Sequence, residues 1–445
     1  MEESFPVMSI LRLHPRRVLD LEVPHRMLLA CLLFTAASPS FHCASSDDCS
    51  LLGVCTAGAC VCNAGWTGAS CATMDLLALD TTHGYVNPSA ASWGGRPIKV
   101  GVGAAARWHM AVTEIKNKCP LILFQYNSQV VRAVSASANV ASSYTRVSDA
   151  EGGTILPPFH HNPTLIGPTP DGVYLIFFIG AANSSNEIDC RAGLPDVPTH
   201  PSPAIQSNGY ITMAWTKDPS LKGPWSTRVV LRDNGPGENQ TSWHCIENNP
   251  SVFVLANGTV VMTYRANGCD KKDKTTSGEH LGIAVSPHWS GEFVRDPHYF
   301  VGPDTAGGAN NEDPFLWYQI DPKTSQESWH IVNHQQSSNN VCGVSKMWDN
   351  RTKKWDTGHT CGAHWYAHSM HGPWKQSTEP AYTENVTFVN GTRGRYRTRQ
   401  RPQLVFAEDG VTPLALFNGA SFEGNNPDLA ILTHTYVQQF NHNYE

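Results

Sequence analysis

Asn162-Pro-Thr-Leu165, Asn249-Pro-Ser-Val252, Asp313-Pro-Phe-Leu316 and Arg401-Pro-Gln-Leu404 are four copies of one pattern in this chain of 445 residues. In each copy a polar residue precedes a proline, and a turn follows seven or eight residues after that proline. The turns are Asp171-Gly172, Asn257-Gly258, Asp321-Pro322 and Asp409-Gly410. Such dipeptides mark tight turns. The pattern therefore predicts that each copy opens a β-strand that returns through a tight turn.

Further strands follow each opening, so the repeating unit is a small sheet. A second apolar run comes after the turn, and a third strand ends in Ala-x-Ser or Ala-x-Thr. These endings are Ala133-Val-Ser135, Ala214-Trp-Thr216, Ala284-Val-Ser286 and Ala367-His-Ser369. An early copy opens at Trp93-Gly-Gly-Arg-Pro-Ile98 and makes five units. Four-stranded sheets repeated around a channel form a β-propeller. We therefore predict an all-β fold with a five-bladed β-propeller over residues 78–440.

Residues 43–71 contain six cysteines in the spacing Cys43-x5-Cys49-x5-Cys55-x4-Cys60-x-Cys62-x8-Cys71. A segment this short cannot bury a sufficient core and depends on disulfides. The spacing and the stretch Gly65-Trp-Thr-Gly68 resemble an EGF-like module. This resemblance implies the disulfides Cys43–Cys55, Cys49–Cys60 and Cys62–Cys71. Calcium-binding modules carry acidic and amide residues before the first cysteine, where this chain has Pro39-Ser-Phe-His42, so we expect no calcium.

Residues 1–42 have the character of a leader with a signal peptide. Basic residues precede the apolar run at residues 27–34, and small residues follow it, which is the order of a secretory signal. A signal anchor and initiation at Met27 stay open as alternatives. Without Cys31 the chain keeps twelve cysteines, and it has six glycosylation sequons. We expect a disulfide-bonded glycoprotein that is secreted or at the cell surface.

The large domain resembles the five-bladed propellers of the arabinanase/levansucrase/invertase superfamily of glycosidases. The resemblance lies in the strand openings, the Gly-Pro-Trp stretches at 223–225 and 372–374, and Glu312-Asp-Pro-Phe-Leu-Trp317. It implies three carboxylates in the channel: a base or nucleophile, an acid and a third that orients substrate. Glu312 matches the acid. Asn249 stands where the third carboxylate is expected, and the first blade, Ser92-Trp-Gly-Gly95, has none.

Other residues can supplement Glu312. Glu247 lies two residues before Asn249 and would share its face of an extended strand, as a second catalytic carboxylate or as a structural hydrogen-bond partner. Asp313 alternates with Glu312 and is expected to point away from the channel. The candidate sugar-binding residues are His161, Asn162, Asn249, Arg401 and Trp93. We expect no metal, because His364, His368 and His371 lie on a strand, where four residues span about 13 Å.

These observations favour a secreted glycoside hydrolase that acts on a poly- or oligosaccharide at the channel, with no cofactor. The alternative is an inactive carbohydrate-binding or adhesion propeller with an EGF-like spacer; a lyase or transferase is a third possibility. Carbohydrate is the expected partner, and the EGF-like module offers a site for a protein. The net charge of −6 is spread without runs and gives no footprint for nucleic acid.

Outside the EGF-like module we predict the disulfide Cys342–Cys361, which brackets an insertion with the polar turn at residues 349–354. Closing a loop of this length stabilises a fold by about 3 kcal/mol in the chain-entropy model. Non-reducing peptide mapping should yield the cross-linked peptide, and replacing both cysteines by alanine should lower the free energy of unfolding by about that amount. Recovery of Cys342 as a free thiol would exclude this pairing.

Overall fold

The computed structural model describes residues 42–181, 187–193, 209–232, 243, 246–267, 279–298, 300–301, 310–321, 324–336, 341, 348–349, 354–355, 360–422 and 433–442. All of them belong to one compact unit, 41–445. In this part of the chain the fold is nearly all β, with one short α-helix, α1 (Phe124–Asn127). Three 3-10 turns, Gly103–Ala105, Leu121–Leu123 and Asp149–Glu151, complete the helical residues there.

Five antiparallel sheets form the blades of a propeller. Blade 1 contains β6 (Ala91–Val100), β7 (Arg107–Ile115), β8 (Ser128–Ser135), β9 (Tyr144–Arg146) and β10 (Thr154–Leu156). Blade 2 contains β11 (His160–Ile166), β12 (Tyr174–Ala181), β13 (Gly209–Thr216) and β14 (Ser226–Arg232). Blade 3 contains β15 (Ile246–Val254), β16 (Val260–Asn267), β17 (Glu279–Ser286) and β18 (Val294–Arg295).

Blade 4 contains β19 (Asn310–Ile320), β20 (Glu327–Gln336), β23 (Thr360–Ala367) and β24 (Lys375–Gln376). A small hairpin, β21 (Trp348–Asp349) and β22 (Lys354–Trp355), lies between its second and third strands. Blade 5 contains β25 (Asn385–Thr387), β26 (Arg393–Phe406), β27 (Pro413–Phe422), β28 (His434–Gln439) and β5 (Gly84–Tyr85). The predicted all-β, five-bladed fold is therefore confirmed.

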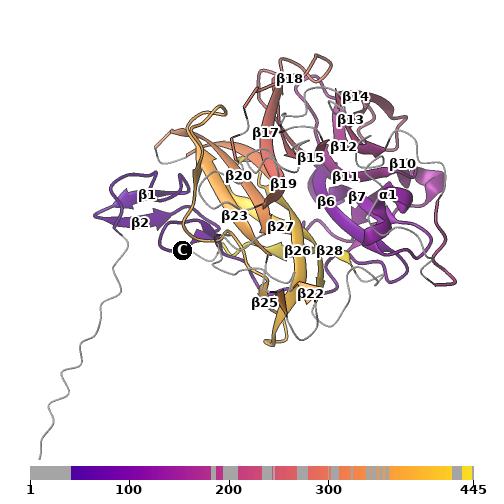
Figure 1. The fold of residues 1–445 in the computed structure, drawn as a ribbon, viewed down its shortest axis with the longest axis horizontal. Coiled ribbons are helices and arrows are strands. Elements are labelled where there is room, and N and C mark those ends of the chain that lie inside the picture. Colours follow the sequence, from indigo (N-terminus) through magenta and orange to yellow (C-terminus); the bar gives the residue numbers. More distant parts are fainter. Residues whose placement is uncertain are drawn as a thin grey trace, which may run out of the picture. The chain divides into compact units, whose positions relative to one another are not determined.

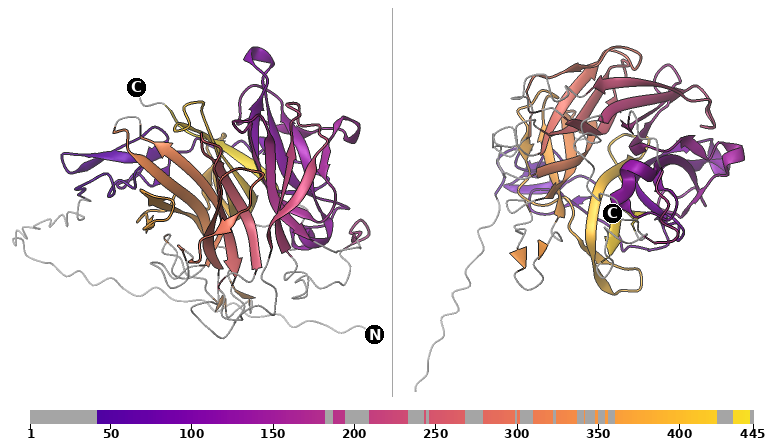
Figure 2. Two further views of the ribbon diagram at one scale, coloured as in Figure 1. Left: turned by 90° about the horizontal axis from the view of Figure 1, so that it is seen from above. Right: turned by 45° about the vertical axis from the view of Figure 1, so that its right-hand side comes forward.

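The inner strands β6, β11, β15, β19 and β26 lie around a common centre (Figure 1), and each contacts the next until β26 meets β6. The long strands of the blades are seen from the side in Figure 2. The ring closes through the N-terminal strand β5, which pairs with β28 of the last blade. Apolar cores fill the space between neighbouring blades, such as the cluster of Phe177, Met213, Met262 and Tyr264 between blades 2 and 3.

Each inner strand contains a β-bulge at the same place in its blade. The register with the second strand shifts after Trp93, His161, Asn248, Glu312 and Gln400. The next residue has a left-handed backbone in every blade, with φ between 50° and 59°: Gly94, Asn162, Asn249, Asp313 and Arg401. In four blades a proline follows, which has no N–H to donate to the ladder. The repeated proline motif of the sequence is therefore a repeated bulge, and its prolines occupy equivalent places in successive blades.

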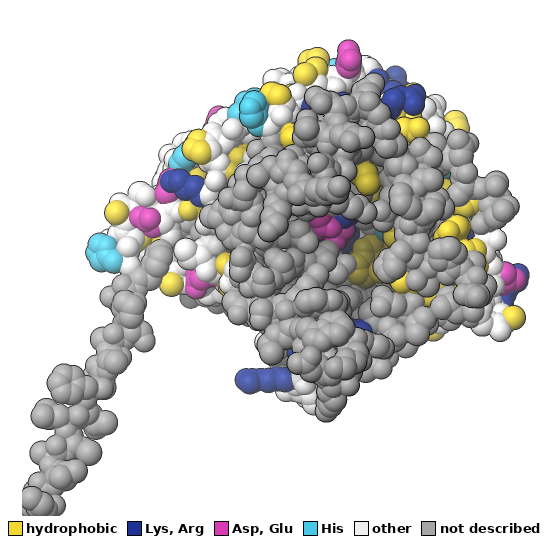
Figure 3. All heavy atoms as spheres, viewed as in Figure 1, with side chains coloured by type: hydrophobic (Ala, Val, Ile, Leu, Met, Phe, Trp, Pro, Cys, Tyr) yellow, Lys and Arg dark blue, Asp and Glu magenta, His cyan; other side chains and the backbone are white. Residues whose placement is uncertain are grey.

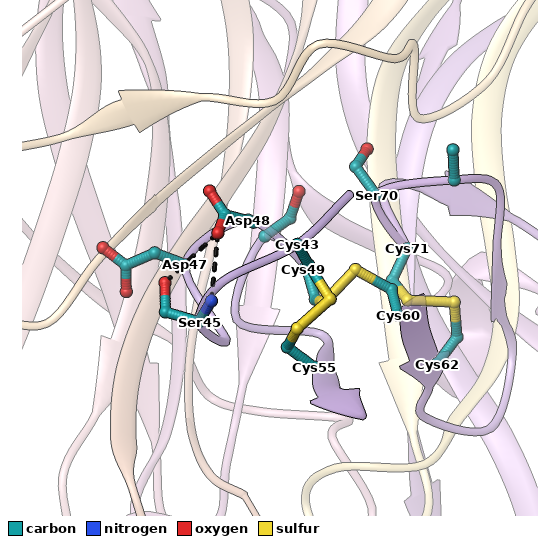
Figure 4. Close-up of a disulfide and its surroundings, with 12 residues drawn as sticks. Cys43, Ser45, Asp47, Asp48, Cys49, Cys55, Cys60, Cys62, Ser70 and Cys71 are labelled. Atoms are coloured by element: carbon teal, nitrogen blue, oxygen red, sulfur yellow. Dashed lines mark hydrogen bonds between the residues drawn. A yellow bond between two sulfur atoms is a disulfide. The ribbon is translucent and has the colours of Figure 1, made fainter. Parts of the chain in front are cut away.

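The EGF-like module contains the hairpin β1 (Gly53–Thr56) and β2 (Ala59–Cys62) and the pair β3 (Trp66–Thr67) and β4 (Thr73–Met74). Its disulfides are those that the resemblance implied, Cys43–Cys55, Cys49–Cys60 and Cys62–Cys71 (Figure 4). A fourth bond joins Cys119 to Cys190 in the propeller. Cys361 is also disulfide-bonded, but Cys342 lies outside the described residues, so their pairing stays a prediction.

The module packs against the propeller. Figures 1 and 2 draw it beside the orange strands of blade 4. Trp66 is buried and stacks on Trp317 of β19, with ring centroids 6.0 Å apart and planes 11° from parallel. The carboxylate of Glu379 accepts hydrogen bonds from the N–H groups of Ala69 (3.1 Å) and Ser70 (2.8 Å). The module thus shares one apolar core with blades 4 and 5.

Other expectations fall partly outside the described residues. The leader at 1–41 is not described, and nor are Cys245 and Cys269. Within the described ranges no helix is of the length and apolar character that a membrane crossing needs.

The shared core predicts that loosening the EGF-like module also destabilises the propeller. Trp66→Ala should lower the free energy of unfolding by about 3–5 kcal/mol, the usual loss for a buried tryptophan. Urea unfolding followed by far-ultraviolet circular dichroism would measure this, because that signal comes mainly from the blades. Val61→Ala, at a side chain of the same module that is 50% exposed, should change it by less than about 0.5 kcal/mol. An unshifted transition for Trp66→Ala would mean that the two parts unfold independently.

Candidate active site

Four of the five bulge residues carry side chains that meet at the centre of the ring. The Nδ2 group of Asn162 donates to Oδ1 of Asn249 (2.8 Å) and lies 3.5 Å from Oδ1 of Asp313. The guanidinium of Arg401 lies 3.4 Å from the same oxygen of Asp313. All four side chains are buried. We call Asn162, Asn249, Asp313 and Arg401 the axial plug.

Asp313 therefore points toward the centre, and the expectation that it points away was wrong. That expectation relied on the alternation of side chains along a regular strand. The bulge at Asp313 inserts one residue into this alternation, so Glu312 and Asp313 both lie on the channel side. The same irregularity occurs at Asn249, so face assignments next to it do not follow from spacing.

Blade 1 contributes a glycine to this ring, and Arg401 fills the space. A Cβ atom built on Gly94 would lie 2.5 Å from Cγ of Arg401. Arg401 contacts Asp313 through Nη1. Its Nη2 group donates to the carbonyl oxygens of Asn162 (2.9 Å) and Pro250 (3.2 Å) and to Oγ1 of Thr164 (3.2 Å). The place where the resemblance implies a catalytic base thus has a glycine, with a cation packed against it.

Next to the plug lies a group of charged side chains from blades 3 and 4, the mouth cluster: Arg265, Glu279, Glu312 and His334. Arg265 Nη1 donates to Oε1 of Glu312 (2.8 Å), and its Nη2 donates to Oε1 of Glu279. His334 Nε2 lies 3.2 Å from Oε2 of Glu312, and its Nδ1 lies 3.5 Å from Oδ2 of Asp313. The side chains of Glu279 and Glu312 are 13% and 18% exposed, but Oε2 of Glu279 is itself buried.

The antiparallel sheets bring these four residues to one end of the blades. Glu312 is near the start of β19 and lies directly opposite His334 near the end of β20. Arg265 is near the end of β16, and Glu279 is the first residue of β17. The end of a second strand lies beside the start of the first and third strands, so all four side chains share this end. Figure 3 shows acidic and basic side chains close together near the centre of the face it draws.

The environment sets the charges of the cluster. Burial alone would lower the pKa of His334, but its hydrogen bonds to Asp313 and Glu312 and their charges raise it to about 9. Burial raises the pKa of Glu279 to about 7; Arg265 opposes this rise and the charge of Glu312 adds to it. Near neutral pH His334 is therefore a cation, and Glu279 exchanges its proton in the range where many enzymes work.

Glu247, the other predicted carboxylate, is held elsewhere in blade 3. It is fully buried, and both its oxygens accept hydrogen bonds from Arg295 of β18, at 2.6 Å each. Burial raises its pKa and Arg295 opposes the rise. The carboxylate that interacts with Glu312 is instead Glu279, through their charges and through Arg265. Glu279 does not belong to any of the sequence motifs described above. The one sequence signal for it is an acidic residue that opens the third strand of the blade before Glu312.

The remaining predicted contact residues line the walls. His161 is buried, its Nδ1 lies 2.9 Å from Oγ of Ser128, and its ring stacks on Phe124. Burial and the charge of Arg401 lower its pKa to about 3, so it is neutral. Trp93 is 3% exposed and packs against Gly419 of β27. Neither ring presents a free face to a sugar in this conformation.

The cluster is better suited to charge pairing than to holding a metal. Glu312, Asp313 and His334 place one ligand atom each within 4.8 Å of one another. A histidine ligand must be neutral, whereas both ring nitrogens of His334 face carboxylates. Arg265 and Arg401 also approach these carboxylates. The three histidines considered in the sequence diverge: His364 contacts His330, His368 contacts Asp47 and His371 contacts Asp296.

Comparisons with known proteins agree with both parts of the fold. The family model of the teneurin-like EGF domain matches residues 45–73. No curated protein matches the chain. A solved structure described as a glycoside hydrolase has a TM-score of 0.50 at 11% identity and covers 82% of this chain and 92% of its own. At this identity the likeness shows the fold alone.

Two α-L-arabinofuranosidases are also among the similar structures. The catalytic domain from Coprinopsis cinerea has a TM-score of 0.47 at 12% identity, covering 84% of this chain and 96% of its own. The enzyme from Podospora anserina, solved with cellotriose, has a TM-score of 0.48 at 12% identity, covering 85% and 98%.

The raised pKa of His334 predicts a pH dependence of stability. The folded chain holds this proton more tightly than the unfolded chain, whose value is near 6.5. The protonated His334 therefore contributes fully to the free energy of unfolding below about pH 6.5, and this contribution is lost as the pH rises through about 9. Urea unfolding at a series of pH values should show that the free energy of unfolding declines between pH 7 and 9. The variant His334→Gln should show a smaller decline, whereas the control His298→Gln, at an exposed side chain, should decline as the wild type does. A wild-type curve that is flat in this range would contradict the assigned charge state.

Proposed function

We propose that the protein is an extracellular glycoside hydrolase that cleaves a poly- or oligosaccharide at the mouth of the propeller channel. The observation that carries the proposal is the mouth cluster: Glu312, partly exposed and bound by Arg265 and His334, with Glu279 on the same guanidinium. Cleavage of a glycosidic bond requires two carboxyl groups in different protonation states across the scissile bond. The cluster brings the carboxyl groups of Glu279 and Glu312 to one guanidinium, and we assign Glu312 as one catalytic carboxylate.

The extracellular location is supported by the disulfides and the EGF-like module. Four disulfides join described cysteines, and such bonds persist in oxidising compartments. A protein partner of the module would use the surface around the hairpin of β1 and β2, because its other side packs on blade 4. The sugar is proposed as a class only: an arabinose-, xylose-, galactose- or fructose-type polymer or glycan.

A second candidate is a propeller that binds carbohydrate without cleaving it. The packing of Arg401 against Gly94 favours it, because it leaves no carboxylate at the position where the resemblance implies a base. Asn249, at the expected third carboxylate, favours it as well. In this case Glu312 would contact sugar hydroxyl groups, and its loss would change affinity only.

The two candidates differ in their response to Glu312→Gln. A glycosidase should lose turnover by a factor of about 100 to 10,000, the scale of a lost catalytic acid or base, with folding and sugar affinity largely kept. Aryl glycosides and plant or algal polysaccharides should be assayed with the deglycosylated protein, together with calorimetric binding. Glu327→Gln is the matched control, because Glu327 is exposed at the opposite end of blade 4. Full turnover in Glu312→Gln would remove Glu312 from the mechanism, and binding without turnover in the wild type would favour the second candidate.

A further inference from the structure

We infer that residues 116–127, which join the second and third strands of blade 1, form an apolar wall of the channel mouth, and that Phe124 of this wall packs against the ring of the bound sugar. The inference rests on the part of the proposed function that places a sugar at the mouth, and it deepens that part. It gives the sugar a binding surface across the channel from Glu312, on a segment outside the repeated strand openings.

The first step of the argument is the place of this segment. β7 ends at Ile115 and β8 begins at Ser128. The end of a second strand and the start of a third strand lie at the mouth end of a blade, as in blades 3 and 4. The segment contains the 3-10 turn Leu121–Leu123 and the helix α1, and α1 lies beside β11 of blade 2 (Figure 1). The segment therefore stands at the same end of the propeller as Glu312.

The second step is the contact between Phe124 and the inner strand of blade 2. The ring of Phe124 stacks on the ring of His161, with ring centroids 4.4 Å apart and planes 29° from parallel. His161 directly precedes the plug residue of its blade, as Glu312 does in blade 4, and the charge of Glu312 reaches it. Because His161 is buried and Phe124 is partly exposed, the surface of the mouth at this blade is the ring of Phe124.

The third step is the fixed position of the wall. A disulfide joins Cys119 of the segment to Cys190, and both cysteines lie in one buried apolar cluster. Nδ2 of Asn127 donates to the carbonyl oxygen of Ile188 (2.7 Å). The residues that carry Phe124 are thus held on both sides of it. A surface that is ordered before binding loses less conformational entropy when a ligand packs on it.

The fourth step is complementarity to a sugar. A sugar ring has apolar C–H groups on its faces and hydroxyl groups around its edge. The face of an aromatic ring carries partial negative charge and attracts such C–H groups, whereas a carboxylate accepts hydrogen bonds from hydroxyl groups. Blades 1 and 2 carry Phe124 and its support, and blade 4, which neighbours neither of them in the ring, carries Glu312. The mouth thus has one apolar and one polar wall, as ligand pockets commonly do.

Phe124→Leu and Phe124→Tyr test this contact. Leucine keeps apolar bulk without an aromatic face. The affinity for those arabino-, xylo-, galacto- or fructo-oligosaccharides that bind the wild type should therefore fall by a factor of about 2 to 10 in titration calorimetry. Tyrosine keeps the aromatic face, so its affinity should stay within about twofold of the wild type. With aryl glycosides as substrates, Phe124→Leu should raise KM and largely keep kcat, because the contact is made equally in the ground state and the transition state.

Saturation-transfer NMR gives a readout that a purely structural role of Phe124 would not produce. The protein would be labelled so that its phenylalanines alone carry hydrogen. Irradiation of their ring protons should then saturate the C–H protons of a bound methyl arabinoside, xyloside, galactoside or fructoside, and Phe124→Leu should abolish this transfer. Val102→Ala is the control, because Val102 is 86% exposed between β6 and β7, at the other end of blade 1. Urea unfolding checks the fold, and Phe124→Met replaces Phe124→Leu if the latter does not fold.

The outcomes separate this contact from the proposed hydrolysis. Wild-type affinity in Phe124→Leu would overturn the inference and leave the proposed function standing. Reduced affinity in Phe124→Leu without saturation transfer in the wild type would also overturn it, because Phe124 would then only support His161. A wild type that binds sugars through Phe124 without turnover would support the contact and overturn the hydrolase assignment. A wild type that binds none of these sugars would overturn both.

Discussion

The side chain of Arg401, from blade 5, lies at the centre of the propeller and touches the other four blades. From β26 of blade 5 it bonds Asn162 and Thr164 of blade 2, Pro250 of blade 3 and Asp313 of blade 4, while its side chain fills the space beside Gly94 of blade 1. A long side chain with a φ of 50° is unusual, and such a conformation costs about 1–3 kcal/mol. The surrounding bonds hold it because a buried cation must be paired.

The plug has a consequence for the chemistry. Because Arg401 and Asp313 neutralise each other at the centre, the next charged side chains lie one step outward, in the mouth cluster. His334 links the two groups by contacting both Asp313 and Glu312. The mouth cluster thus combines a carboxylate of an inner strand, Glu312, with one of a third strand, Glu279. The fold is a five-bladed propeller, and its polar centre is organised around a cation.

The EGF-like module packs on β19, the strand that carries Glu312, further along its length. Glu312 lies near the start of β19 and Trp317 further along it. Trp317 is covered by Trp66 of the module and stacks on His330, with ring centroids 4.8 Å apart. His330 and His364 form a buried hydrogen-bonded pair (3.0 Å) that continues through Ser377 to Ser50 of the module. Three disulfides hold the module together, but its apolar face is completed by blade 4.

The sequence by itself determined the all-β class, the five repeats, the module with its pairing, and the place of Glu312 beside the fourth-blade proline. These features are local: turn dipeptides, cysteine spacing and a repeated proline act over a few residues. The repeat did not reveal that each proline follows a bulge, so the argument from alternating side chains failed at Asp313. The same argument selected Glu247 as the second carboxylate near Glu312, whereas the carboxylate that shares Arg265 with Glu312 is Glu279. Only the tertiary structure decided that Arg265, Glu279 and His334 surround Glu312, because they come from three other strands and meet through sheet register and ring closure. Their pKa values follow from that meeting, since burial and neighbouring charge exist only once the blades have packed.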